Sequence, residues 1–233
     1  MSGNKEDVVP RQFDHELEDL RNSVLAMGGL VEEQLASSVK SLSRQDDELA
    51  KAVIAGDVRV NRMELEIDAR CSQLIALRQP ARSDLRLILA IIKTIADLER
   101  IGDEAEKISR LATENMMRER QKSDYGQLRH LGRHVRTMLS SALDAFARMD
   151  SQQARAVAGE DSEVDEEYES LVRQLITRMM EDPRKIREAL DIMWAARALE
   201  RVGDHAKNIS QYVIYLVEDR DIRHRSVVRD DPR

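Results

Sequence analysis

The sequence has 233 residues, a formal net charge of -7 at pH 7, 35% charged residues and only 3% aromatic residues. A chain of this length can bury a substantial core in one or two domains. The acidic balance disfavours nonspecific nucleic-acid binding, which depends on neutralising phosphates with Lys and Arg. Abundant charge and scarce aromatic residues favour long amphipathic helices over strands.

Disulfide formation and membrane insertion are both disfavoured by the sequence. Cys71 is the only cysteine, so no intramolecular disulfide can form, and we expect Cys71 to be a buried apolar residue. The N-terminus has no apolar run typical of a secretory signal, and no run of about 18 apolar residues predicts a transmembrane helix. We therefore expect a cytoplasmic protein that meets a membrane only through its partners.

The first half of the chain predicts three helices in succession. Apolar residues between Phe13 and Leu42 recur at steps of three and four, which indicates one helix over about 13–43. The same periodicity predicts helices over about 46–77 and 83–117.

The second half repeats this pattern, with predicted helices over about 125–149, 153–181 and 184–217. Two sequence matches support a duplication: "LERIGDEAEKI" from Leu98 matches "LERVGDHAKNI" from Leu199, and the stretch "AVIAGDVRVNRME" resembles "AVAGEDSEVDEEY". We therefore predict an all-α fold of two similar three-helix bundles from an internal duplication.

The predicted domain organisation follows from this repeat. The first three-helix bundle is expected over 10–117 and the second over 125–219. The polar segment 118–124 is the predicted linker, and the charged, aperiodic segment 220–233 is predicted to be a flexible tail.

Acidic residues interrupt the apolar stripe of the third predicted helix. On a helical wheel of about 100° per residue, Glu99 falls inside the apolar arc and Asp103 lies at its edge. Asp97 points away from this arc and is predicted to face water. A carboxylate in an apolar stripe needs a counter-charge or a metal ion, because burying it unpaired is very costly. Glu99 and Asp103 are four residues apart, so they share one helix face and repel unless a cation lies between them.

The second predicted helix supplies further polar groups. Asp57 and Glu64 interrupt its apolar stripe, and Asn61 lies at the margin. If the second and third helices are antiparallel neighbours, Asp57 and Asn61 approach Glu99 and Asp103. The corresponding set in the second half is Asp161, Asp165, Glu200 and Asp204. Tyr168 replaces Glu64 there.

These oxygen-only sets suit hard or borderline ions such as iron, manganese or magnesium, whereas zinc usually prefers some nitrogen or sulfur. The competing explanation is an ion pair with Arg or Lys from another helix. Gly102 and Gly203 precede the two Asp residues, although Gly in a helix costs about 1 kcal/mol relative to Ala. We therefore expect a neighbouring helix, or a metal ion, to come close there.

The histidines are weaker candidates for a metal site. His130 and His134 are four residues apart, but two histidines without a third ligand are expected to be ordinary surface residues. His205 follows Asp204, and its counterpart in the first motif is Glu104, so the duplication does not preserve this histidine.

The paired motifs, each closing a three-helix unit, resemble those of the PhoU family of bacterial phosphate-transport accessory proteins, and "DVRVNRMELEID" is similar to the family's second-helix motif. The resemblance extends from about Phe13 to Asp219. It implies multinuclear iron or zinc clusters on motifs that correspond here to Glu99 with Asp103, Glu200 with Asp204, and Asp161 with Asp165. The pair Asp57 and Asn61 departs from the acidic pattern, so we expect the first cluster to bind fewer ions, or to bind them more weakly.

The resemblance also implies a function. Family members act as negative regulators of the phosphate-starvation (Pho) response and of phosphate uptake. They are thought to connect PstB, the ATPase of the phosphate transporter, with the histidine kinase PhoR. We therefore expect an adaptor rather than an enzyme. The long helices with adaptable apolar residues make a homodimer plausible.

Two other functions fit the same residues. One is a carboxylate-bridged dimetal enzyme or an iron-storage bundle. Such proteins usually add a Glu-x-x-His motif, and this sequence has no Glu followed three residues later by His. The other is a metal-free helical scaffold whose acids meet basic residues of a partner.

Overall fold

The computed structural model describes residues 8–115 and 125–219, which form six long helices and one short 3-10 helix. The first repeat contains α1 (Val8–Arg44), α2 (Asp47–Arg78) and α3 (Arg82–Asn115). The second contains α4 (Gly126–Arg148), α5 (Ser151–Glu181), η1 (Pro183–Lys185) and α6 (Ile186–Glu218). The prediction of a duplicated all-α fold is confirmed. The predicted linker 118–124 and tail 220–233 lie outside the described residues.

The first two helices of each repeat are joined by the same tight turn. Gln45 and Met149 adopt left-handed backbone angles, with φ of 54° and 53°, and end α1 and α4. Asp46 then caps α2, because its side chain accepts a hydrogen bond from the backbone N–H of Leu49 at 3.1 Å, and Asp150 caps α5 in the same manner. These short connections make α1 and α2, and likewise α4 and α5, antiparallel neighbours.

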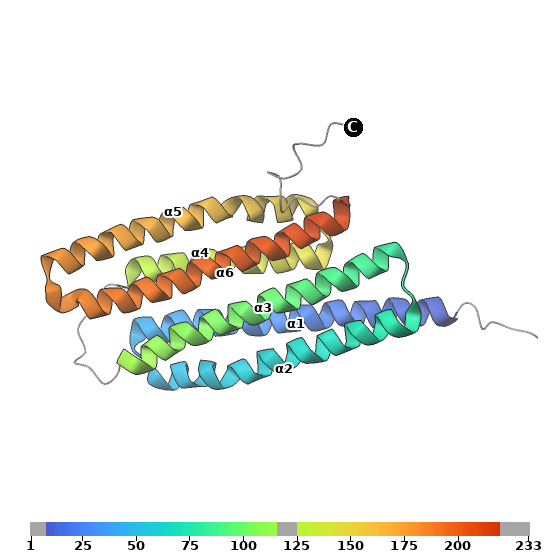
Figure 1. Cartoon of the computed structure of the whole chain (residues 1–233), viewed down its shortest axis with the longest axis horizontal. Coiled ribbons are helices and arrows are strands. Elements are labelled where there is room, and N and C mark those ends of the chain that lie inside the picture. The colour runs from blue at the N-terminus through green and yellow to red at the C-terminus, as the bar shows by residue number, and fades with distance from the viewer. Residues whose placement is uncertain (1–7, 116–124, 220–233) are drawn as a thin grey trace, which may run out of the picture.

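The two repeats pack side by side with their third helices in the middle (Figure 1). In this view α3 and α6 lie next to each other, α2 and α5 lie at the outer edges, and α1 and α4 lie behind. Across the repeat boundary, α3 packs on α6 and α1 packs on α4. Buried apolar side chains from both repeats form one continuous core.

The packing of α1 on α4 fixes how the first helices of the repeats correspond. A Cβ atom built on Gly28 would lie 2.6 Å from Leu143 Cδ1, and one built on Gly132 would lie 3.1 Å from Val39 Cγ2. Each pair is the counterpart of the other, because 132 − 28 and 143 − 39 both equal 104. The same offset places the first repeat's Gln34 opposite Met138 of the second.

Two further expectations concern burial and membranes. Cys71 is fully buried, and burial raises the pKa of its thiol to about 11, which confirms its role as a buried apolar residue. In the part of the chain that the structure describes, no helix is both long enough and apolar enough to cross a bilayer.

Candidate metal centres and the repeat interface

The first carboxylate centre lies between α2 and α3. Asp57 is only 7% exposed, and its Oδ2 accepts a hydrogen bond from Asn61 Nδ2 at 2.9 Å. Asp103 of α3 lies close enough to raise the pKa of both Asp57 and Glu99. The short connection over 79–81 makes α2 and α3 antiparallel neighbours, so the four residues predicted in the first half do come together.

Negative charge accumulates at this centre, although the nearby charges of Arg110 and Arg100 oppose the rise in the pKa of Asp57 and Glu99, respectively. Burial is the largest cause of the raised pKa of Asp57, followed by the charges of Glu106 and Asp103. Burial likewise raises the pKa of Glu99, with further contributions from Asp103, Glu64 and Asp57. Glu106 was not among the predicted site residues. It pairs with the exposed guanidinium of Arg110 at 2.5 Å.

Gly102 of α3 lies close to side chains of α1 and α2. A Cβ atom at Gly102 would lie 3.3 Å from both Asp57 Oδ1 and Val60 Cγ1, and 3.7 Å from Gln34 Oε1. The close approach expected at this glycine is therefore present, and two of the three nearest atoms are oxygens. Gln34 comes from α1 and was not predicted. Its signal in the sequence was a polar residue beside Val31 and Leu35 in an apolar period.

The second centre lies between α5 and α6 and brings together Asp161, Asp165, Glu200 and Asp204. Burial is the largest cause of the raised pKa of Glu200, and the nearby Arg197, which donates to Glu200 at 2.7 Å, opposes it. The pKa of Asp204 is raised first by partial burial and then by Asp161. The four residues predicted in the second half therefore also come together.

A lysine distinguishes the second centre from the first. Lys207 of α6 forms an ion pair with Asp161, and its charge lowers the pKa of Asp204. Lys207 occupies the position of Glu106, because both lie four residues after the glycine of their motif. The surroundings of the second glycine also differ. A Cβ atom at Gly203 would meet Val164 Cγ1 at 3.2 Å and Val135 Cγ1 at 3.8 Å.

The donor chemistry at both centres fits a hard cation, although the side chains are not arranged as a complete site. Within residues 8–115 and 125–219, no group of three His, Cys, Asp or Glu side chains is already placed to hold a metal ion. Several buried acceptor oxygens have no hydrogen-bond partner in these residues, among them Asp57 Oδ1, Asn61 Oδ1 and Glu200 Oε2. Such atoms are costly to leave unpaired, and oxygen donors are what hard cations prefer.

One prediction about this region is wrong. Asp97 does not face water: it is 6% exposed and accepts hydrogen bonds from His205 Nδ1 at 2.7 Å and Asn208 Nδ2 at 3.3 Å. The wheel placed Asp97 on the polar side of α3 because only one buried face was assumed. The packing of α6 against α3 buries a second face, and His205 lies there at 7% exposure.

A second polar pair crosses the same interface. Glu104 is 3% exposed, and its Oε1 accepts from Arg201 Nη1 at 2.8 Å across the repeat boundary and from Lys107 Nζ at 3.0 Å within α3. Glu104 and His205 occupy equivalent positions in the two motifs. One position that the duplication does not preserve therefore contributes polar contacts between the repeats.

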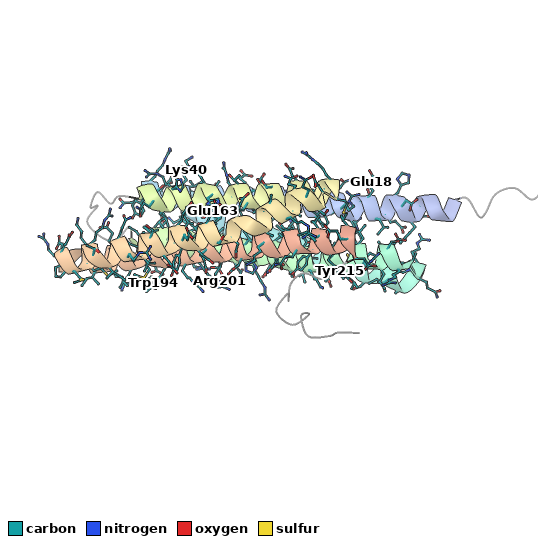
Figure 2. The ribbon with its side chains drawn as sticks, turned by 90° about the horizontal axis from the view of Figure 1, so that it is seen from above. Glu18, Lys40, Glu163, Trp194, Arg201 and Tyr215 are labelled. Atoms are coloured by element: carbon teal, nitrogen blue, oxygen red, sulfur yellow. The ribbon has the colours of Figure 1, made fainter. Side chains whose placement is uncertain are left out.

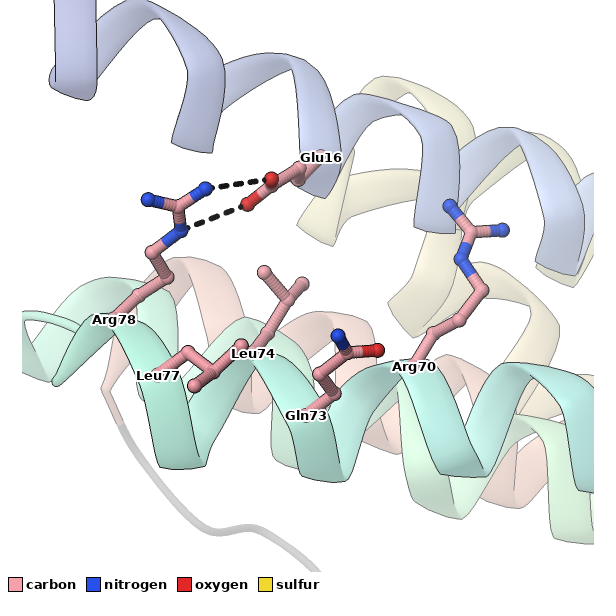
Figure 3. Close-up of a pocket in the computed structure, with 6 residues that line it drawn as sticks. All are labelled: Glu16, Arg70, Gln73, Leu74, Leu77 and Arg78. Atoms are coloured by element: carbon pink, nitrogen blue, oxygen red, sulfur yellow. Dashed lines mark hydrogen bonds and ion pairs between the residues drawn. The ribbon is translucent and has the colours of Figure 1, made fainter.

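The two histidines of α4 and one further cavity are weaker candidate sites. His130 is exposed and His134 half-buried, and the Nδ1 atoms of both lie against Glu167 of α5, at 3.1 and 2.9 Å. A cavity of about 290 Å³ lies between the start of α1 and the end of α2. Figure 3 shows Glu16 and Arg78 bridging it through two hydrogen bonds, at 3.2 and 2.8 Å, so these two charges are already paired.

The fold and its two centres define a class of all-α proteins: a tandem three-helix unit with a carboxylate centre in each copy. The sequence profile of the PhoU domain matches residues 24–112 and again 128–213, one match in each repeat. The chain therefore belongs to the PhoU family.

Individual relatives agree with this assignment. The chain is 49% identical to the "Phosphate-specific transport system accessory protein PhoU homolog" of Pseudomonas putida, over 97% of this chain and 90% of that protein. It matches the crystal structure of PhoU from Pseudomonas aeruginosa with a TM-score of 0.86 and 50% identity, covering 89% of this chain and all of that one. The phosphate transport system regulatory protein PhoU from Streptococcus pneumoniae matches with a TM-score of 0.84 and 30% identity, over 90% and 99% of the two chains.

Proposed function

We propose that this chain is a regulatory adaptor of phosphate transport and not an enzyme. The observation that carries the proposal is similarity over nearly the whole chain to relatives named as accessory and regulatory proteins of phosphate transport. In this role it restrains the phosphate-starvation (Pho) response and phosphate uptake when phosphate is plentiful. It acts in the cytoplasm, as a homodimer, between the transporter ATPase PstB and the histidine kinase PhoR.

Metal ions at the two carboxylate centres are part of the proposal. Raised pKa values at Asp57, Glu99, Glu200 and Asp204, together with unpartnered buried oxygens, support cation binding. Iron or zinc is expected from the family resemblance, and manganese or magnesium from the oxygen donors alone. When bound, such an ion supplies the positive charge that the acidic side chains otherwise lack.

A basic groove supports a partner-binding role. It is a cavity of about 240 Å³ between α1 and α4, with an apolar floor that includes Val39. Five cationic side chains line it: Lys40, Arg44, Arg129, Arg133 and Arg136. The charge of Arg136 also acts on Glu32 of α1, where it opposes the burial that raises the pKa of that carboxyl group. Figure 2 shows Lys40 on the side opposite Trp194 and Arg201. In a chain of net charge -7, such a groove attracts an acidic segment of a partner.

Affinity purification from phosphate-replete cells of the native host tests the adaptor role. We expect the tagged chain to recover PstB, PhoR or both, and we expect its deletion to switch on phosphate-starvation genes in rich phosphate. Arg133→Glu in the groove should weaken recovery, whereas Arg62→Glu on the exposed side of α2 should not. Recovery of neither protein, with the starvation genes silent in the deletion strain, would contradict the proposal.

A further inference from the structure

The amide of Gln34 is the most unusual buried polar group near either centre. Gln34 is 5% exposed, yet neither Oε1 nor Nε2 has a hydrogen-bond partner in the described part of the chain. Buried amides nearly always find partners, because leaving one unpaired costs about 1–3 kcal/mol. A buried amide that has no hydrogen-bond partner needs an explanation other than packing.

Gln34 is aimed at the first carboxylate centre. Its Oε1 and Asp57 Oδ1 lie 3.7 and 3.3 Å from the position that a Cβ atom of Gly102 would take. Asp57 is itself more than nine-tenths buried, and this Oδ1 atom also has no partner among the described residues. Two acceptor oxygens from α1 and α2 therefore converge over a glycine of α3, and two acceptors cannot satisfy each other.

We propose that Gln34 is a neutral oxygen ligand of the first centre, and that this centre binds a hard divalent cation more tightly than the second. The inference rests on the proposed metal function and adds an amide ligand from α1. Carboxylate and amide oxygens together are a donor set for Mg²⁺ or Mn²⁺. Gly102 keeps open the place that a side chain would otherwise fill.

The second repeat lacks each of these features. Met138, a fully buried apolar side chain, stands where the first repeat has Gln34. The position above Gly203 is lined by Val164 and Val135 rather than by oxygens. Lys207 already supplies a positive charge to Asp161, so an incoming cation must compete with it. These differences affect the cation affinity of the two centres more than the single negative charge that the first centre lacks because it has Asn61 instead of an acid.

A rotated Gln34 amide offers a different explanation. Its NH₂ group would then donate to Asp57 Oδ1, and no cation would be needed. The two explanations predict opposite effects of Gln34→Met on the metal-free protein. If Gln34 is a ligand, its amide is unpaired in the metal-free protein, and replacing it with Met should raise the melting temperature. If Gln34 instead donates a hydrogen bond to Asp57, the same substitution should lower the melting temperature.

Calorimetric titration with Mn²⁺, combined with melting curves, tests the inference on the full-length protein. We expect two classes of site in the wild-type protein. Gln34→Met should weaken the tighter class roughly 10- to 100-fold, raise the melting temperature without metal, and reduce the rise that Mn²⁺ produces. Asp204→Asn, the matched control at the second centre, should weaken only the looser class.

Three results would overturn the inference. Unchanged Mn²⁺ affinity in Gln34→Met, with binding intact in the wild type, removes Gln34 as a ligand and leaves the proposed metal function standing. A lower metal-free melting temperature with unchanged Mn²⁺ affinity identifies the amide as a hydrogen-bond donor. No Mn²⁺ uptake by the wild type, and no iron or zinc by elemental analysis, overturns the metal part of the proposed function as well.

Discussion

The two carboxylate centres occupy equivalent places in the two repeats, but they balance their charge in different ways. In the second centre Lys207 forms an ion pair with Asp161 and so neutralises part of the negative charge. In the first centre the same position is Glu106, which adds to the negative charge around Asp57. Duplication has thus kept the helices and the spacing of the acids. The exchange of Glu106 for Lys207 is one of the differences that change how the charge of the two acidic centres is compensated.

The repeat interface shows the same divergence at another pair of equivalent positions. Glu104 reaches across to Arg201 of α6, whereas His205 reaches across to Asp97 of α3. A strictly repeated motif would place either two acids or two histidines at this boundary. The divergence gives each buried polar group a partner in the other repeat, and it ties the two bundles together.

The largest expected effect comes from breaking the Asp97–His205 pair. Asp97→Ala leaves His205 and Asn208 without their buried acceptor and should lower the free energy of unfolding by about 3 kcal/mol. Urea denaturation measures this change. Glu114→Ala, an exposed substitution on the same helix, should stay within about 0.5 kcal/mol of the wild type. Equal stability of the two variants would show that the pair does not join the repeats.

Lys207→Glu should convert the second centre into the type found in the first. It removes the partner of Asp161 and adds a like charge, so we expect a loss of about 2 kcal/mol in unfolding free energy without metal. The reciprocal Glu106→Lys should stabilise the metal-free protein and weaken Mn²⁺ binding at the first centre. Denaturation with and without Mn²⁺ measures both variants. A Glu106→Lys protein that binds Mn²⁺ as well as the wild type would argue against unequal centres.

The two motif glycines should respond differently to alanine. Gly203→Ala gains helix propensity and meets only valine side chains, whereas Gly102→Ala presses a methyl group against the unpaired Asp57 Oδ1. We expect Gly102→Ala to be about 1 kcal/mol less stable than Gly203→Ala in thermal unfolding. Only Gly102→Ala should also weaken Mn²⁺ binding. If both variants behave alike, the oxygen lining at Gly102 has no special role.

The smallest expected effect concerns pH. The pKa of Asp57 is raised in the folded protein, so its charge destabilises the fold above that pKa, and the penalty disappears as pH falls below the ordinary carboxyl range. Asp57→Asn should therefore raise the unfolding free energy by about 0.5–1 kcal/mol at pH 7 without metal.

This gain should shrink as the pH is lowered from 7 toward 4, since the wild-type carboxyl group then becomes protonated. Denaturation at several pH values, on metal-free wild type and variant, measures the difference. Asp161→Asn, which removes the partner of Lys207, should instead destabilise the protein at pH 7. A stability difference between Asp57→Asn and wild type that grows toward acid pH would contradict the assignment.

Helical periodicity was enough to predict the six helices and both acidic sets. Asp57 and Glu99 stood out because they interrupt apolar stripes, and the short connection between α2 and α3 then forces them together. Asp97 could not be placed in this way, because a wheel drawn for one bundle does not include the second bundle that packs on α3. Its burial depends on contact between residues about a hundred positions apart in the chain.

The roles of Gln34 and Lys207 were also beyond the sequence. Gln34 was visible as a polar residue at a core position, but its target required knowing how three helices pack around Gly102. Lys207 differs from Glu106 in an otherwise similar motif, and only the structure shows that its side chain reaches across to α5. Sequence repetition therefore predicted equivalent backbones, and the structure was needed to show unequal chemistry.

Anomalous diffraction from crystals of this protein grown with limiting Mn²⁺ tests most directly whether the two centres are unequal. We predict a manganese peak at the first centre, coordinated by Asp57 and Gln34, while the second centre fills only at higher Mn²⁺ concentration. A peak that appears first at the second centre, or one at the first centre that is not bound to Gln34, would contradict the account.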